Sequence, residues 1–243
     1  NGASKSVSGV SVEWTDANNV CLLLKSGTTV YRATVSKAAT SGTINMAKAF
    51  TINTSSVRIN GSYVNLSSYT HQGMGYHDGK IYVPLWGGSA GKSNQGVIAV
   101  YDTFDATGKT ITSDPYLSFR VTSGAYSGFE IESCDISSDG KMYFNVNRWT
   151  ASSGNYDAIL RFNGFVTGSN DPTGHVDAVS GGTGKIYIKG WAFDKDCIRQ
   201  AIGIHIYIGG VFQSGIYANT SRPDVNSAFL CGNNHGFEAT INT

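Results

Sequence analysis

Charged residues are scarce in this sequence, and their two signs nearly cancel. Asp, Glu, Lys and Arg make up 14% of the 243 residues, and the net charge is +1 at pH 7. Proteins that bind nucleic acids or anionic membranes usually present a strong basic excess. The composition therefore predicts neither of these partners.

Long apolar runs are also lacking. The longest, residues 20–24, has the length of one strand, whereas a membrane-spanning helix needs about 20 apolar residues. Membrane insertion is therefore not expected. The sequence begins at Asn1 without a signal peptide, which favours a mature or processed form.

CxxC pairs are absent too, which argues against a zinc site or a thioredoxin-like motif. The four cysteines are Cys21, Cys134, Cys197 and Cys231. We predict a disulfide between Cys197 and Cys231, which share the C-terminal segment; the alternative is a pair of buried thiols. Cys21 and Cys134 either pair across the N-terminal domain or remain thiols.

Turn-forming and strand-forming residues are abundant instead. The chain has 30 glycines and 13 tyrosines, and Ser, Thr and Asn dominate its polar positions. This profile is typical of an extracellular all-β protein and does not suit a helical one. We therefore predict an all-β protein that is secreted or displayed on the cell surface.

A pattern of about 61 residues occurs three times in the N-terminal part. A turn at residues 77–80 precedes a strand at 81–86, a glycine-rich loop and a strand at 96–101; the same order recurs at 138–162 and, more faintly, at 17–35. Unit one begins with residues 11–14, and its fourth strand is either 49–52 or 62–66. Unit two ends with residues 116–121, and unit three opens with the alternating strand 129–136.

Such repeats favour four-stranded blades of a propeller. Closed propellers usually carry about 4–8 blades, and three are seen here. Further blades could come from upstream residues or a separate chain, or another element could close the ring. An open sandwich that repeats a hairpin is the fourth alternative.

A run of turn residues at 167–174 marks a domain boundary. We predict a propeller-like repeat domain over residues 1–167 and a small β-sandwich over residues 174–243. Strand patterns at 185–194 and 202–208 support the second domain, and Gly209-Gly210 is a two-residue hairpin turn.

The C-terminal domain resembles an accessory module of secreted proteins from Gram-positive bacteria. The matching motifs are Gly174-His175-Val176-Asp177, Gly190-Trp191-Ala192-Phe193-Asp194, Ile204-His205-Ile206-Tyr207, Ser221-Arg222-Pro223-Asp224-Val225 and Asn234-His235-Gly236-Phe237. The resemblance implies an accessory module attached to cell-wall or glycan-acting proteins, and it does not imply an activity. Arg222 is expected to bind a carboxylate such as Asp177 or Asp224.

The N-terminal domain is similar to propeller-like domains of secreted Gram-positive proteins, including helveticin J-type bacteriocins. The similarity rests on residues 72–76, 78–82 and 130–135. These short patterns are common to many propellers.

Glu130 and Glu132 are two residues apart on a predicted strand, so we expect them to share one face. Paired carboxylates can act as acid and base in glycoside hydrolysis, and His71 could assist as a base. We favour the simpler alternative that these side chains line a propeller channel, because no second acid across a cleft is evident. No catalytic role is therefore assigned, and an enzyme would use Glu130, Glu132 and His71.

Aromatic side chains beside polar loops are better candidates for binding. Trp86 and Trp149 nearly coincide in the repeat and border loops rich in Gly, Ser and Asn. Exposed Trp and Tyr in such surroundings form sugar-stacking or protein-binding surfaces, although packing between blades is an equal alternative. We predict that His71, Trp86, Asn94, Trp149 and Tyr156 bind the ligand.

No cofactor is predicted. Oxygen ligands at residues 169–171 and 194–196 could hold calcium, but their spacing matches no EF-hand loop. No metal ligands are assigned.

These features predict a binding protein that engages a glycan or a host protein through loops of the repeat domain. An immunoglobulin-type glycoprotein is one such host partner. The alternatives are a glycan hydrolase or lyase and a bacteriocin-like antagonist.

Overall fold

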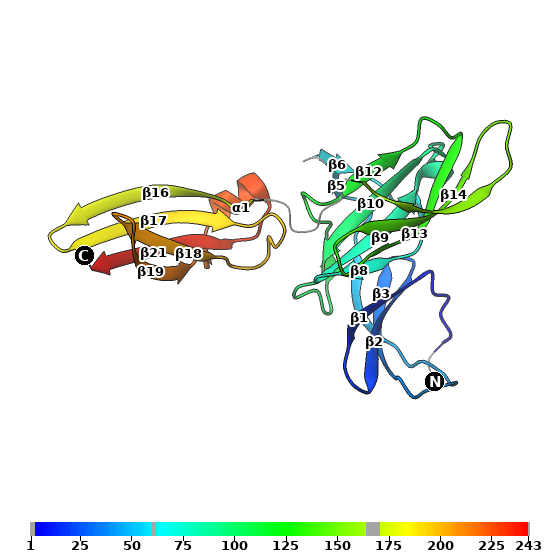
Figure 1. The fold of residues 1–243 in the computed structure, drawn as a ribbon, viewed down its shortest axis with the longest axis horizontal. Helices are drawn as coiled ribbons and strands as arrows, with labels where there is room; N and C mark the ends of the chain where they lie inside the picture. Colours follow the sequence, from blue (N-terminus) through cyan, green and yellow to red (C-terminus); the bar gives the residue numbers. More distant parts are fainter. Residues whose placement is uncertain (1–2, 60–61, 164–170, 243) are drawn as a thin grey trace. The chain divides into compact units, whose positions relative to one another are not determined.

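The structure is a computed structural model that describes residues 3–59, 62–163 and 171–242. Strands dominate it, as the composition predicts, and the protein is all-β (Figure 1). The chain forms two compact units, Asn1–Val166 and Thr167–Thr243. No helix in the described ranges has the length and apolar character needed to cross a bilayer.

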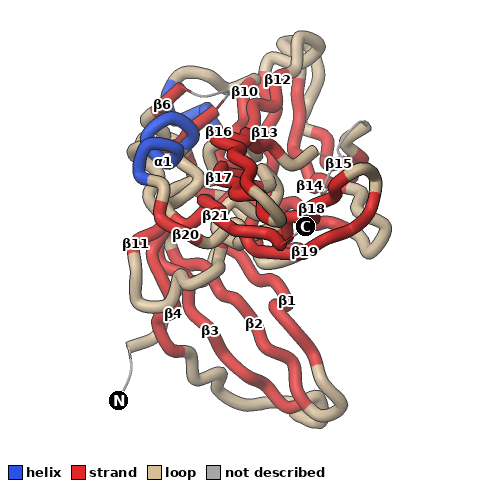
Figure 2. The backbone as a smooth tube through the Cα atoms, turned by 90° about the vertical axis from the view of Figure 1, so that its left-hand side faces the viewer, coloured by secondary structure: helices blue, strands red, loops and turns tan. Residues whose placement is uncertain are grey.

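The first unit contains three main sheets. The first sheet has the order β1-β2-β3-β4-β11, and β1 to β4 lie side by side (Figure 2). Its strands are β1 (Gly9–Thr15), β2 (Asn19–Ser26), β3 (Thr29–Ser36), β4 (Ala47–Ile52) and the short β11 (Thr110–Ile111). The fourth strand of unit one is therefore β4, whereas residues 62–64 belong to a separate hairpin.

The second sheet has the order β12-β10-β9-β7, and β8 also pairs with β9. Its strands are β7 (Thr70–His71), β8 (Gly75–His77), β9 (Lys80–Trp86), β10 (Gln95–Asp102) and β12 (Phe119–Thr122). A short 3-10 helix, η1 (Gly87–Ala90), follows β9, and a hairpin of β5 (Val57–Ile59) and β6 (Ser62–Val64) precedes β7. Asp78 and Gly79 adopt positive φ angles of 45° and 73°, as the predicted Asp-Gly turn requires.

The third sheet has three strands among the described residues, in the order β13-β14-β15. They are β13 (Gly128–Ile136), β14 (Met142–Trp149) and β15 (Tyr156–Arg161). The register of β13 on β14 shifts between Ile131 and Ser133. This irregularity places Glu132 at a bulge, so the expected regular alternation with Glu130 is interrupted.

The second sheet lies between two apolar cores. On β9, Ile81, Val83 and Leu85 belong to the core shared with the first sheet. Tyr82 and Ile98 belong to the core shared with β13 and β14. Because alternate residues of one strand point to opposite faces, a sheet covered on both sides is apolar at nearly every position, as β9 and β10 are.

The three sheets approach one another at glycines in or beside β1, β8 and β13. The Gly73 amide donates a hydrogen bond to the Glu132 carbonyl at 2.7 Å. A Cβ at Gly73 would lie 2.8 Å from that oxygen, and one at Gly75 would lie 2.6 Å from the Cys134 carbonyl oxygen. Between the first and second sheets, a Cβ at Gly9 on β1 would lie 2.9 Å from the Met74 nitrogen. Side chains larger than hydrogen would therefore push the sheets apart.

The second unit contains a four-stranded sheet and a two-stranded hairpin. The sheet has the order β16-β17-β21-β20, and β18 pairs with β19. The elements of the second unit are β16 (Thr173–Gly182), β17 (Lys185–Phe193), β18 (Gly203–Ile208), β19 (Val211–Tyr217), β20 (Thr220–Ser221), α1 (Pro223–Phe229) and β21 (Asn234–Asn242). Gly209 and Gly210 have φ angles of 57° and 82°, which confirms the predicted hairpin turn.

Arg222 binds both carboxylates that the sequence proposed for it. Its Nε and Nη2 donate to Asp224 at 2.8 and 2.6 Å, and Nη1 donates to Asp177 at 2.5 Å. Pro223 begins α1, a helix that the motif pattern did not predict.

The disulfide predicted between Cys197 and Cys231 is not formed in this structure. Cys231 is a buried thiol, and its Sγ lies 3.5 Å from the Gly232 carbonyl oxygen. Cys21 and Cys134 are buried thiols in different sheets. Pairing of Cys197 with Cys231 therefore stays a prediction.

Candidate functional site

Trp86 and Trp149 touch each other at one end of the second and third sheets. Trp86 ends β9, and Trp149 ends β14. Their ring centroids are 6.1 Å apart and the planes meet at 72°, a favourable edge-to-face arrangement. Both side chains remain partly exposed. The two tryptophans of the repeat therefore join two sheets and still reach solvent.

Each tryptophan ring lies against a glycine. Gly128 is the direct cross-strand partner of Trp149, and a Cβ there would lie 1.9 Å from the indole ring. A Cβ at Gly88 would lie 2.0 Å from the ring of Trp86. Because glycine has no side chain, the indole rings can occupy the space beside Gly88 and Gly128.

The loop after β9 is tied to the third sheet by hydrogen bonds from Ser93. The Ser93 carbonyl accepts from Trp86 Nε1 and from the Phe129 amide, each at 2.9 Å. The Ser93 hydroxyl donates to the Ser127 carbonyl at 2.9 Å. The position of Trp86 is therefore fixed by both sheets.

Asn94, a predicted ligand residue, holds a neighbouring loop. Its Nδ2 donates to the Ser123 carbonyl at 3.4 Å, and the Ser123 amide donates to the Asn94 carbonyl at 3.2 Å. Its described contacts are therefore structural.

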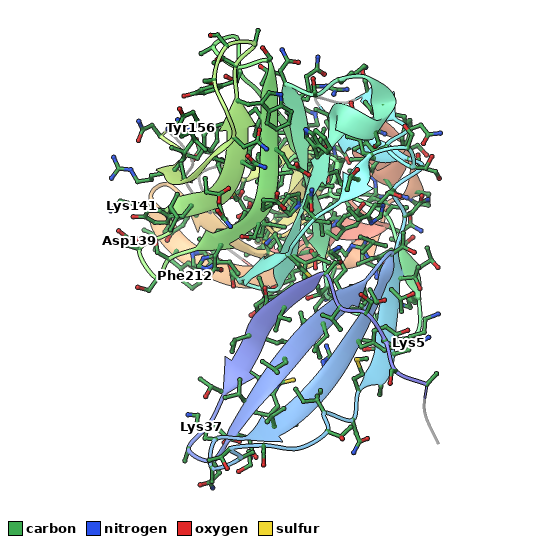
Figure 3. All side chains as sticks on the ribbon, turned by 90° about the vertical axis from the view of Figure 1, so that its right-hand side faces the viewer. Lys5, Lys37, Asp139, Lys141, Tyr156 and Phe212 are labelled. Carbon is green, nitrogen blue, oxygen red and sulfur yellow. The ribbon has the colours of Figure 1, made fainter. Side chains whose placement is uncertain are left out.

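Further aromatic residues lie at the same end of the third sheet, on the face opposite to that of Trp149. Arg148 Nη1 donates to the Tyr126 hydroxyl at 2.7 Å, and the guanidinium lies 5.1 Å from the centre of that ring. Tyr156 pairs with Arg148 across β14 and β15 and is 58% exposed. In Figure 3, Tyr156 lies above the Asp139–Lys141 turn that joins β13 to β14. We call Trp86, Trp149, Tyr126 and Tyr156 the tryptophan end.

Three polar side chains continue from Trp149 across the third sheet. Glu130 on β13 lies opposite Asn147 on β14, and Asn147 lies opposite Asp157 on β15. Asn147 is two residues from Trp149 on the same strand, so the two side chains share a face. We call Glu130, Asn147 and Asp157 the polar row. The amide oxygen of Asn147 is buried and has no hydrogen-bond partner in the described part of the chain.

Glu130 is held by Gln72, which lies between β7 and β8. Gln72 Nε2 donates to Glu130 Oε1. Partial burial raises the pKa of the Glu130 carboxyl, the charge of Glu132 raises it further, and the Gln72 bond opposes both effects. The charge of Glu132 therefore acts on Glu130 although Glu132 stands at the bulge.

His71 faces the first sheet. Its Nδ1 lies 3.3 Å from the carbonyl oxygen of Gly27 in the β2–β3 turn. Burial and the charge of Lys25 lower the pKa of the imidazole, which favours its neutral form. Lys25 is fully buried, its Nζ donates to Ser8 Oγ at 2.9 Å, and burial lowers its pKa to about 8. Across residues 3–59, 62–163 and 171–242, no hydrogen bond joins His71 to Glu130 or Glu132.

Two of the proposed calcium ligands, Asp194 and Asp196, lie in a turn. Asp194 Oδ1 accepts a hydrogen bond from the Asp196 amide at 2.8 Å, as in a simple turn. Ser169 and Asn170 lie outside the described residues. Among those described, no three His, Cys, Asp or Glu side chains gather as metal ligands would.

The sequence patterns did not single out Gln72, Tyr126, Asn147, Arg148 or Asp157. Counting back from the Ser138-Asp139-Gly140 turn would place Ile131 opposite Asn147. The bulge shifts this register by one, so Glu130 takes that position. Aromatic spacing could locate the tryptophans, but the polar row depends on a bulge with no clear sequence signal.

Comparison with known proteins gives little similarity. No protein-family model matches this sequence, and neither does any curated protein. A solved structure described as an ulvan lyase of a new polysaccharide lyase family, bound to a GlcA(1-4)Rha3S unit, aligns with 87% of this chain and 55% of its own. The TM-score is 0.26 and 9% of the residues are identical, which is too low to support an argument. This chain spans about half the length of that protein.

Proposed function

We propose that this is a secreted binding protein whose propeller-like unit engages a glycan through the tryptophan end. The observation that carries the proposal is the contact between Trp86 and Trp149, two partly exposed rings held by two sheets. Indole faces suit the apolar C–H faces of sugar rings, and neighbouring amide and carboxylate groups can bind hydroxyls.

The local backbone also suits a saccharide. Ser93, Ser127 and Gly128 bring small, polar surroundings to the rings, and Tyr156 is an exposed ring at the same end of the sheet but on its other face. Most carbohydrate hydroxyls need partners that both donate and accept, and serine, asparagine and backbone groups provide both. In this proposal, the second unit is a small β-sandwich that serves as an accessory module.

A glycan array probed with the full chain tests the proposal. We expect Trp149→Ala to lose at least about tenfold in affinity for the best glycan, because aromatic anchors carry much of the energy at such sites. Trp14→Ala is the matched control, since Trp14 is exposed on β1 in the first sheet. Loss of binding in both variants, or in neither, would contradict the assignment.

A host glycoprotein would present the same chemistry through its attached glycan. Immunoglobulin captured on a sensor, with and without enzymatic removal of its glycans, distinguishes the two kinds of contact. Binding that survives glycan removal would point to a protein surface as the partner.

A hydrolase or lyase is the second candidate, and one observation favours it. A raised pKa is what a general acid needs, and burial beside Glu132 raises that of Glu130. Release of reducing ends from cell-wall and mucin polysaccharides by the wild type, and its loss in Glu130→Gln, would establish catalysis. Absence of turnover in the wild type would remove this candidate.

A further inference from the structure

We propose that the polar row beside Trp149 selects glycans that carry free amino groups. This inference rests on the proposed glycan-binding function and names the ligand class of the same site. Its basis is an imbalance between hydrogen-bond acceptors and donors on one face of the third sheet.

Acceptors dominate the polar row. The carboxylates of Glu130 and Asp157 have no protons to donate when ionised, and Asn147 between them has a buried amide oxygen without a partner in the described ranges. The described side-chain donor to the row is Gln72, which bonds Glu130. Directly opposite residues in a sheet have Cβ atoms about 5 Å apart, so a single group can reach two neighbours.

Negative charge accumulates at the same place. Glu130 and Asp157 lie on either side of Asn147, on β13 and β15, and Glu132 is two residues from Glu130 on β13. The cations of this sheet have other partners: Arg148 binds Tyr126, Arg161 binds the side chain of Asn163, and Lys141 binds Asp139 at the far turn. The polar row is therefore complementary to a cation.

Trp149 adds a requirement that a simple cation does not meet. Its ring lies over Gly128, next to Glu130 on the same face of the sheet. An indole face attracts both an ammonium group and the C–H face of a sugar. A sugar with a free amine places three N–H donors and an apolar ring face in one unit, which matches the row and the ring together.

Titration calorimetry with the full chain tests this selectivity. The probes are the β-1,4-linked hexamers of glucosamine and of N-acetylglucosamine, together with a uronic acid hexamer, at about pH 6 where most carboxylates are charged and amines protonated. We expect the glucosamine hexamer to bind at least about tenfold more tightly than the acetylated one, and the uronic acid hexamer most weakly. Raising the salt concentration should narrow the difference, because ions screen exposed charges.

The double variant Glu130→Gln, Asp157→Asn should lose the preference for free amines, so that its affinities for the glucosamine and N-acetylglucosamine hexamers become equal. Asp139→Asn is the control, because Asp139 lies in the turn at the other end of the sheet. Thermal unfolding of each variant reports folding. If the double variant fails to fold, the ratio of the two wild-type affinities and its salt dependence still decide the question.

Equal affinities for the glucosamine and N-acetylglucosamine hexamers would overturn this inference and leave the proposed function standing. Binding of none of the three hexamers, together with a blank glycan array, would overturn both. A lysine-rich peptide that competes as well as the glucosamine hexamer would show recognition of any polycation, and would also overturn the selectivity for sugars.

Discussion

The two faces of the third sheet come from the same three strands and meet different surroundings. On one face, Ile131, Phe144 and Val146 are buried against the second sheet. On the other, Trp149, Asn147 and Asn145 are open or partly open. Alternation along the strands produces both faces, and contact with the second sheet makes the first one apolar. Groups that lie on the open face are therefore free to serve a ligand.

The largest effect is expected on the covered face. Phe144→Ala should lower the free energy of unfolding by about 3–5 kcal/mol, because the removed ring leaves a cavity between two sheets. Urea denaturation followed by tryptophan fluorescence measures the change. An effect below about 1 kcal/mol would mean that this face is not enclosed as described.

Asp114 is a buried carboxyl group, in contrast to the carboxylates on the open face of the third sheet, and its burial makes stability depend on pH. Asp114 is 2% exposed; its Oδ1 accepts from the amides of Tyr116 and Leu117 at 2.8 and 2.9 Å, and its Oδ2 has no partner in the described part of the chain. Burial raises the pKa of Asp114 to about 6, so the fold favours the protonated form. Its contribution to stability is thus fully present below about pH 4 and is lost as the pH rises through 6.

Asp114→Asn should remove about 2–3 kcal/mol of this pH dependence, since each pKa unit corresponds to about 1.4 kcal/mol. The free energies of unfolding of wild type and Asp114→Asn are measured from denaturation curves at several values between about pH 4 and 7. The contributions of the other carboxylates are the same in both proteins and cancel in the difference. Glu130→Gln, on the open face, should change the slope less. Equal slopes for wild type and Asp114→Asn would contradict the enclosure of Asp114.

Adding a methyl group at Gly128 tests whether stability and binding depend on the position of the Trp149 ring. Gly128→Ala should displace the Trp149 ring, because the added carbon would occupy its position, and should cost about 1–3 kcal/mol of stability. Glycan affinity should fall as well. Gly124→Ala is the control, since no atom lies within 4 Å of a Cβ at that loop position. Unchanged binding by Gly128→Ala would show that the place of the ring is unimportant.

The smallest effect is expected for an exposed residue beyond the polar row. Asn145→Ala removes an exposed side chain on the open face and should alter stability by less than about 0.5 kcal/mol. It should also leave affinity for glycans unchanged. A large loss of either would extend the site further along β14.

The sequence predicted the strands of the first unit well where both faces are covered. Residues 81–86 and 96–101 fall inside β9 and β10, because apolar runs between turn residues leave little choice. The strands before and after the second Asp-Gly turn, at 129–136 and 142–146, were also correct. The arrangement of the sheets as a propeller and of the second unit as a sandwich remain predictions.

The candidate site was predictable only in part. The tryptophans stand out by composition and repeat position, whereas their contact depends on Gly88 and Gly128 leaving room for the rings. Gln72 and Glu130 are 58 residues apart and meet because the segment between β7 and β8 packs against β13. Such long-range pairs follow from packing between sheets, which local patterns do not encode.

The glycines at which the sheets approach one another have a consequence for ligand binding. Gly73 and Gly75 bring the backbone of the second sheet directly onto the backbone of β13, which fixes the spacing of the two sheets at these positions. Trp86 and Trp149, one from each sheet, therefore keep their separation before a ligand arrives. A site assembled in advance loses little conformational entropy on binding, so a few shallow contacts can hold a mobile saccharide.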